Sequence, residues 1–174
     1  MSSNPHLKIH VEFGDNKADF EGSASEVMKA LMNYITEIYP AYELVKGLML
    51  TVDLERLMRD VEGVIAFTEE GVVVATPRDK LLKLNIKDLI SLHLVKAYLG
   101  HIAGKLAKNT LTVDELLTSI GGKIGTLTGG LSVMVDEGLV ARVGRGEYKI
   151  TTIGITRFQE DALPKIKREI KGEG

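Results

Sequence analysis

Residues 110–154 constrain the fold of this chain more than any other stretch, because helix start and stop signals follow one another there. Thr112 and Glu115 have the spacing of a capping box, in which both side chains satisfy free N–H groups at the first turn of a helix. Gly121 and Gly122 predict the end of that helix, since glycine accepts the left-handed backbone beyond a helix C-terminus. The pattern therefore predicts a short helix followed at once by a tight turn.

A second helix is predicted over 123–137 and is closed by Gly138, because apolar residues recur there every three or four positions. These residues are Ile124, Leu127, Leu131 and Met134. Two runs that favour β-structure, 139–143 and 147–151, then flank the turn sequence Gly144-Arg145-Gly146. Residues 110–154 thus predict helix, turn, helix and β-hairpin in that order.

The second half of this stretch resembles the winged helix-turn-helix superfamily, in the form found in prokaryotic and archaeal regulators. The matching positions are Glu137-Gly138-Leu139-Val140, Arg142, Arg145, and Tyr148-Lys149-Ile150-Thr151 through Gly154. The resemblance implies that residues 123–137 form a recognition helix in the DNA major groove and that the hairpin is a wing touching phosphate.

The DNA-binding residues that the resemblance implies are few for a recognition surface. They are Lys123, Thr126, Thr128 and Ser132 on the helix, and Arg142, Arg145 and Lys149 on the wing. Gly121, Gly125 and Gly129 repeat every four residues and predict a smooth face, which suits DNA phosphate, another protein or a neighbouring helix. Two functions are therefore compatible with the sequence: a homodimeric transcriptional regulator that binds duplex DNA, and a winged-helix adaptor that binds protein without DNA.

The net charge of −2 conceals an asymmetry between the two halves of the chain. Residues 1–80 hold 8 Lys and Arg against 14 Asp and Glu, whereas residues 81–174 hold 14 against 10. A basic rear half favours a polyanionic partner, and an acidic front half favours a protein partner. Within 110–151, however, the balance is 4 basic to 5 acidic residues, so the positive excess lies on the flanking helices.

Residues 1–80 are predicted to form a small N-terminal α+β domain with two β-hairpins, whose role is a ligand, a partner or dimerisation. In order, the predicted elements are a hairpin over 7–21, a helix from 23 to about Tyr39 stopped by Pro40, helices over 42–50 and 53–62, and a hairpin over 64–76. Residues 77–80 are predicted to be a hinge.

Residues 81–174 are predicted to form a mostly helical winged helix-turn-helix domain. It begins with a long helix over 86–108, capped by Asn85 and Asp88, and ends with a helix over 153–170, kinked at Pro164. The long helix is apolar on nearly all sides, so the N-terminal domain or a second subunit must cover what a single winged module does not. The helix over 153–170 is either a dimerisation helix or a helix folded back on its own core, and a homodimer through the two helices is expected.

No catalytic or metal-binding pattern is found. The chain has no cysteine, no G-x-S-x-G motif and no histidine pair at metal-ligand spacing among His6, His10, His93 and His101. The protein is therefore expected to be no enzyme and to need no cofactor or metal. A cytoplasmic location without membrane contact is expected, because no secretory signal is found and charged residues interrupt the longest apolar stretch. The absence of Trp and the single Gln favour a heat-tolerant source.

Overall fold

The computed structural model describes residues 6–38 and 52–172, which fall into two compact units, Met1–Leu50 and Thr51–Gly174. Both units combine helices with small sheets, so the predicted α+β class is confirmed. The predicted domain boundary at residue 80 is wrong, because the division lies at residues 50–51. The predicted stop of the first helix at Tyr39 and Pro40 and the predicted helix over 42–50 lie outside the described residues.

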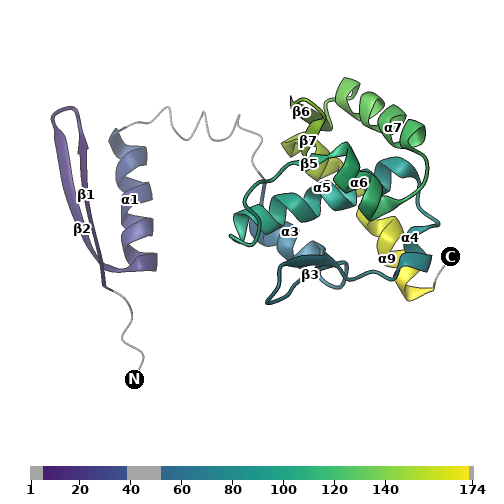
Figure 1. Cartoon of the computed structure of the whole chain (residues 1–174). Coiled ribbons are helices and arrows are strands. Elements are labelled where there is room, and N and C mark those ends of the chain that lie inside the picture. Colours follow the sequence, from purple (N-terminus) through teal and green to yellow (C-terminus); the bar gives the residue numbers. More distant parts are fainter. Residues whose placement is uncertain (1–5, 39–51, 173–174) are drawn as a thin grey trace. The chain divides into compact units, whose positions relative to one another are not determined.

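The first unit is one β-hairpin with one helix (Figure 1). Strands β1 (His6–Phe13) and β2 (Asn16–Ser23) pair along their full length, from His6 opposite Ser23 to Phe13 opposite Asn16. Helix α1 (Ala24–Ile38) follows directly and starts with a capping box formed by Ser23 and Glu26. The Ser23 N–H donates to Glu26 Oε2 at 3.1 Å, and the Glu26 N–H donates to Ser23 Oγ at 3.4 Å.

The second unit is mostly helical and contains two small sheets (Figure 1). Its first elements are α3 (Leu54–Asp60), β3 (Ile65–Phe67), β4 (Val72–Val74), α4 (Arg78–Leu81) and α5 (Ile86–Ile102). They are followed by β5 (Leu111–Thr112), α6 (Val113–Ile120), α7 (Ile124–Asp136), β6 (Val140–Gly144) and β7 (Glu147–Ile150). The chain continues through α8 (Thr152–Arg157), a π-helical turn η1 (Phe158–Ala162) and α9 (Leu163–Lys171).

Helix α5 is the centre of the second unit. It contacts β4, α6, α7, β7, α8 and η1, and Ile90, Leu92, Leu94 and Val95 have no exposed surface. Leu57 of α3 and Val64 before β3 belong to the same core. The second hairpin, β3–β4, is therefore part of this unit and not of an N-terminal domain, because its apolar side covers α5.

Two predicted features, the end of the long helix and the hinge, differ from the structure. The long helix ends at Ile102 and not at Lys108, because the chain turns at Gly104, where φ is +69°, and the Leu106 N–H donates to Gly100 O at 3.0 Å. The predicted hinge over 77–80 is instead the start of α4, which packs beside α9.

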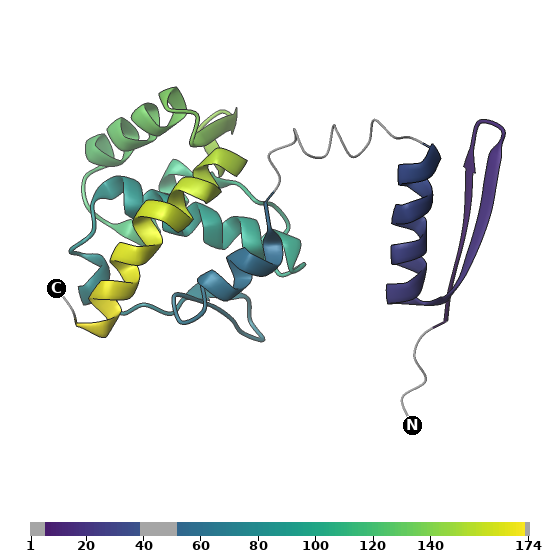
Figure 2. The same cartoon turned by 180° about the vertical axis from the view of Figure 1, so that it is seen from behind.

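The predicted kink at Pro164 is replaced by the π-helical turn η1, which ends two residues before the proline. Proline has no N–H to give to the preceding turn, and a π turn is one way in which a helix accommodates that loss. Figure 2 shows α8, η1 and α9 as one continuous helix across the back of the second unit.

Much of the apolar surface on which a dimer through 86–108 and 153–170 was predicted is covered within one chain. Leu99 of α5 is 1% exposed, and Ile155, Phe158 and Ile166 of the C-terminal helix are between 0% and 2% exposed. This apolar surface is covered by α3, the β3–β4 hairpin, α6 and α7. On the same two segments Ile102, Ile153 and Ile170 stay between 37% and 52% exposed, so the homodimer and its interface stay a prediction.

Candidate nucleic-acid interface

The α6–turn–α7 segment forms as the sequence predicts. The Thr112 N–H donates to Glu115 Oε2 at 2.7 Å, and the Glu115 N–H donates to Thr112 Oγ1 at 3.1 Å, which completes the capping box of α6. Gly121 and Gly122 then adopt φ of +80° and +87°, values that residues with a Cβ rarely adopt. This two-glycine turn sets the direction in which α7 leaves α6.

Helix α7 packs one side against the core and exposes the other. Leu127, Leu131 and Met134 are at most 1% exposed, and a Cβ on Gly130 would lie 3.1 Å from Ile90 Cδ1. Gly125 and Gly129, by contrast, have nothing within 4 Å of a Cβ position. Gly130 is therefore the glycine that packs closely against a neighbouring helix, α5, whereas Gly125 and Gly129 lie on the outer face of α7.

The predicted contact residues of α7 are all exposed, but they do not form one cluster. At about 100° per residue, Ser132 lies with Gly125 and Gly129 in the middle of the outer face, while Thr126 and Thr128 lie on opposite flanks. The Thr128 hydroxyl donates to Ile124 O at 2.9 Å, so it is available to an outside partner only as an acceptor. The outer face of α7 is thus smooth and weakly polar.

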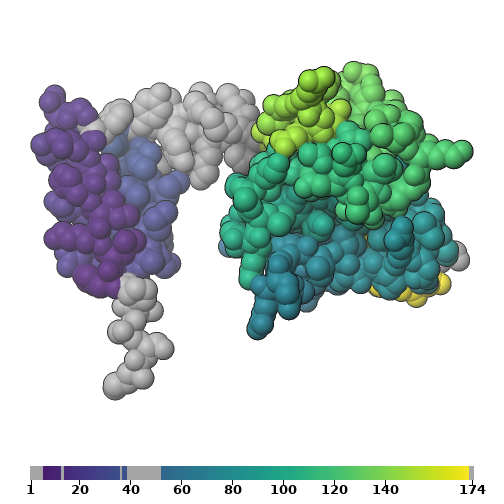
Figure 3. All heavy atoms as spheres, in the orientation of Figure 1, coloured from purple at the N-terminus to yellow at the C-terminus, as the bar shows by residue number. Residues whose placement is uncertain are grey.

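The hairpin β6–β7 belongs to a three-stranded sheet in the order β5–β7–β6, in which β7 is central and β6 lies at an edge. Arg142 pairs with Tyr148 and Ala141 with Lys149, so the side chains of Arg142 and Lys149 lie on opposite faces of the hairpin. Arg145 is exposed at the turn, and the register shifts between Arg142 and Gly144. In Figure 3, the yellow-green hairpin and the green α7 lie side by side along the top of the second unit.

The predicted cations of this surface are not neutralised by neighbours. Within the described residues, Lys123, Arg142, Arg145 and Lys149 form no ion pair. Arg142 instead donates from Nε to Gly144 O at 3.3 Å. Glu147, the acid next to the turn, is held by Lys108 at 2.6 Å, and this hydrogen bond and charge lower the pKa of Glu147 below its usual value. The hairpin therefore presents unpaired positive charge.

Arg78 is a cation of this surface that the sequence does not reveal. Its Nη2 lies 3.1 Å from the Cβ position of Gly121, so the guanidinium lies against the turn between α6 and α7. It is exposed and forms no ion pair within the described part of the chain. No local pattern signals this role, because Arg78 precedes α5 and only the tertiary fold brings α4 to the turn.

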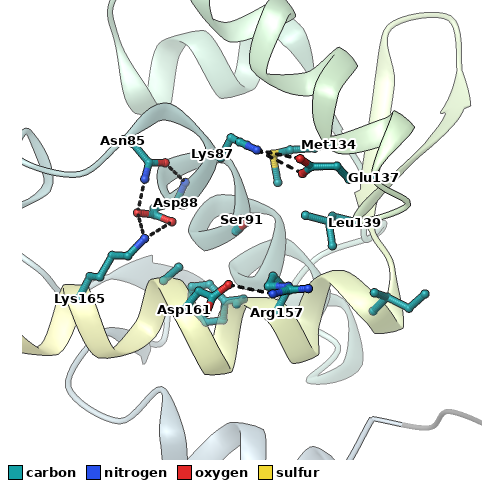
Figure 4. A pocket seen from close by; sticks show the side chains of 13 residues that line it. Asn85, Lys87, Asp88, Ser91, Met134, Glu137, Leu139, Arg157, Asp161 and Lys165 are labelled. Atoms are coloured by element: carbon teal, nitrogen blue, oxygen red, sulfur yellow. Dashed lines mark hydrogen bonds and ion pairs between the residues drawn. The ribbon is translucent and has the colours of Figure 1, made fainter.

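A groove of about 560 Å³ lies between α5, the end of α7 and the C-terminal helix (Figure 4). Its floor includes Met134 and Phe158, each 1% exposed. Its charged side chains are already paired with one another: Lys87 with Glu137 at 3.0 Å, Asp88 with Lys165 at 3.1 Å, and Arg157 with Asp161 at 3.4 Å. Because these pairs satisfy the charges, the groove offers no free ionic group that would define a ligand.

Comparisons with protein-family models, with curated proteins and with solved structures give no match for this chain. Among the described residues, no three His, Asp or Glu side chains are placed to hold a metal ion. No helix of the described part has the length and apolar character needed to cross a membrane. The α6–α7 segment with its neighbouring hairpin is therefore the surface on which a function is best argued.

Proposed function

We propose that the second unit is a winged helix-turn-helix module and that the protein is a transcriptional regulator that binds duplex DNA as a homodimer. The observation that carries this proposal is the unpaired positive charge of the β6–β7 hairpin beside α7, whose outer glycines, Gly125 and Gly129, have no described atom within 4 Å of a Cβ position. Phosphate contacts supply most of the non-specific affinity of DNA-binding proteins, and they need free cations of this kind.

In this proposal α7 enters the major groove with Lys123, Thr126, Thr128 and Ser132, and the hairpin contacts phosphate through Arg142, Arg145 and Lys149. Gly125 and Gly129 let the DNA backbone or base edges approach α7 closely, because no side chain stands between them. A Thr or Ser contact discriminates less than the bidentate contacts of Arg or Asn, which are worth about 1–3 kcal/mol each. Sequence preference is therefore shallow and depends on DNA shape and on the spacing of two half-sites.

A salt series tests the proposal. Binding of the chain to random duplex DNA is measured from low to moderate salt for the wild type, for Arg145→Ala and for Arg59→Ala. Arg59 is an exposed arginine on α3, far in sequence from the hairpin, so it controls for the loss of one charge. We expect the slope of log affinity against log salt to fall by about 1 for Arg145→Ala and to stay unchanged for Arg59→Ala.

The second candidate function is a winged-helix adaptor that binds a protein and no DNA. It is favoured by one observation, the outer face of α7, which is formed largely by glycine, serine and threonine and has no cation after Lys123. If the wild-type chain does not bind duplex DNA even at low salt, the regulator proposal fails and the adaptor remains.

A further inference from the structure

Arg78 begins α4, in the segment that was expected to be a hinge. Its Nη2 lies 3.1 Å from the Cβ position of Gly121, so the guanidinium occupies space next to the turn that a larger side chain would need. Gly121 therefore meets two requirements, because its φ of +80° suits glycine and its missing side chain leaves room for Arg78. The arginine thus lies at the α6–α7 turn, close to where α7 begins after Lys123.

Contacts with α9 and with the core hold α4 beside this turn. Helix α4 packs against α9, and Lys83, which closely follows α4, pairs with Glu169 of α9 at 3.0 Å. Leu81 packs against the core, and the Leu82 N–H donates to Arg78 O at 3.1 Å. The backbone that carries Arg78 is therefore ordered by the fold, so less conformational freedom is lost when this side chain binds a partner.

The positive charge of Arg78 is not neutralised within the described part of the chain. The side chain is exposed and forms no ion pair, and the adjacent acid, Asp79, does not pair with it. The planar guanidinium presents its N–H donors in a fork that matches the geometry of a phosphate. Arg78 is therefore a free cation at a fixed place, of the kind that binds a phosphate oxygen.

We propose that Arg78 binds a DNA phosphate at the end of α7 opposite to the β6–β7 hairpin, an inference that rests on the proposed function. The hairpin follows the C-terminal end of α7, whereas α4 lies below its other end (Figure 1). A helix of 13 residues is about 20 Å long, and the major groove is about 12 Å wide. Arg78 and the hairpin therefore contact phosphates on opposite edges of the groove.

A phosphate contact at each end of α7 fits the composition of this surface. Residues 110–151 hold 4 basic and 5 acidic residues, so a cation from outside this segment adds to a small positive charge. Phosphate contacts fix the register and orientation of a protein on DNA, and they carry no base information. Helix α4 thus positions α7 in the groove, while the weakly polar outer face of α7 meets the bases.

A salt series with single and double variants tests the inference. Binding to random duplex DNA is measured for the wild type, Arg78→Ala, Arg145→Ala, the double variant and Arg59→Ala. Arg78→Ala should lower the slope of log affinity against log salt by about 1 and the affinity by about three- to tenfold near 0.1 M salt. The double variant should lower the slope by about 2, because the two contacts are separate, and Arg59→Ala should leave it unchanged.

The same series separates failure of this inference from failure of the proposed function. If Arg145→Ala lowers the slope and Arg78→Ala does not, the role of Arg78 is refuted and the proposed function stands. If the wild type does not bind duplex DNA even at low salt, the proposed function is refuted and this inference with it.

Two glycine variants test the placement of Arg78 without removing its charge. Gly121 and Gly122 have φ of +80° and +87°, so alanine strains the backbone similarly at both positions. Only at Gly121 does the new Cβ meet Arg78, because nothing lies within 4 Å of the Cβ position of Gly122. Gly121→Ala should therefore weaken DNA binding more than Gly122→Ala, and this difference should vanish in the Arg78→Ala background. Circular dichroism confirms that each variant is folded. Equal losses for the two folded glycine variants in the wild-type background would overturn the inference.

Discussion

The position of Gly154, in the first turn of α8, requires a glycine because neighbouring atoms lie very close to it, and not because of its backbone angles. A Cβ at this position would lie 2.0 Å from Leu139 O and 2.8 Å from Ile150 Cδ1. Replacement by alanine forces the hairpin and α8 apart, so we expect Gly154→Ala to lower the free energy of unfolding by about 2 kcal/mol or more.

Gly125 is the matched control, because it is also a helical glycine but has open space around it. Gly125→Ala should raise the free energy of unfolding by about 0.5–1 kcal/mol through helix propensity. Urea unfolding of both variants checks the pair. Equal effects of the two substitutions would show that the contact between Gly154 and Leu139 is not tight.

Because of the buried His93, we expect the stability of the second unit to fall in acid. His93 is 6% exposed on α5, its Nδ1 has no partner among the described residues, and burial together with nearby Lys96 lowers its pKa from 6.5 to about 4. Between these two pH values the unfolded chain binds a proton that the folded chain does not. Stability therefore falls as pH drops from 6.5 toward 4, by about 3 kcal/mol in total.

The measurement is urea unfolding at several pH values between 7 and 4.5 for the wild type and His93→Leu. The loss of stability in this window should be larger for the wild type, because leucine takes up no proton. The paired acid Glu147 does not interfere, since its pKa lies below 4.5 and its contribution is lost only at lower pH. If the wild type and His93→Leu lose the same stability as the pH falls, His93 is not the cause of the loss.

At the scale of single elements, the outer face of α7 separates the two candidate functions. Gly129 has no neighbour within 4 Å of a Cβ position, so Gly129→Arg fits the folded chain without a clash. If α7 faces DNA, the added charge should raise affinity for random duplex DNA and steepen its salt dependence. A folded variant with unchanged DNA affinity would show that this face of α7 does not meet DNA.

Elements that depend on residues close together in the sequence could be predicted. Elements that depend on contacts between residues far apart in the sequence could not. The capping box of α6 involves only Thr112 and Glu115, so the spacing of the two residues suffices. The π turn at Phe158–Ala162 takes the place of the kink predicted at Pro164, and neither the proline nor the apolar spacing specifies which of the two forms. The approach of Arg78 to Gly121 likewise joins segments on either side of α5, so that part of the candidate site is missing from any local pattern.

At the scale of the whole molecule, the boundary between the two units also depends on contacts between residues far apart in the sequence. The hairpin β3–β4 is visible in the sequence, but the sequence does not say which helix its apolar side covers. Leu57 is fully buried in the same core as Leu127 of α7. Leu57→Ala should therefore lower the stability of the whole second unit by about 2–5 kcal/mol.

Hydrogen exchange checks this expectation, because the amides of α7 should lose protection in Leu57→Ala as much as those of α3. Leu127→Ala is the matched variant, and it should reduce protection in α3 in turn. If Leu57→Ala leaves the exchange of α7 unchanged, the two segments unfold separately, and the core is not one cooperative unit.

The contacts that close the second unit also determine when it can fold during synthesis. Gln159 Nε2 donates to Asp60 Oδ2 at 2.8 Å across 99 residues of sequence, and Lys83 pairs with Glu169 at 3.0 Å. Helix α3 and the residues after α4 therefore gain these contacts only after η1 and α9 have been synthesised. Until α9 has left the ribosome, α5 lacks part of its cover, and the nascent chain presents an apolar helix that chaperones recognise. Slowing translation between the end of α5 and the start of η1 should therefore prolong the exposure of α5.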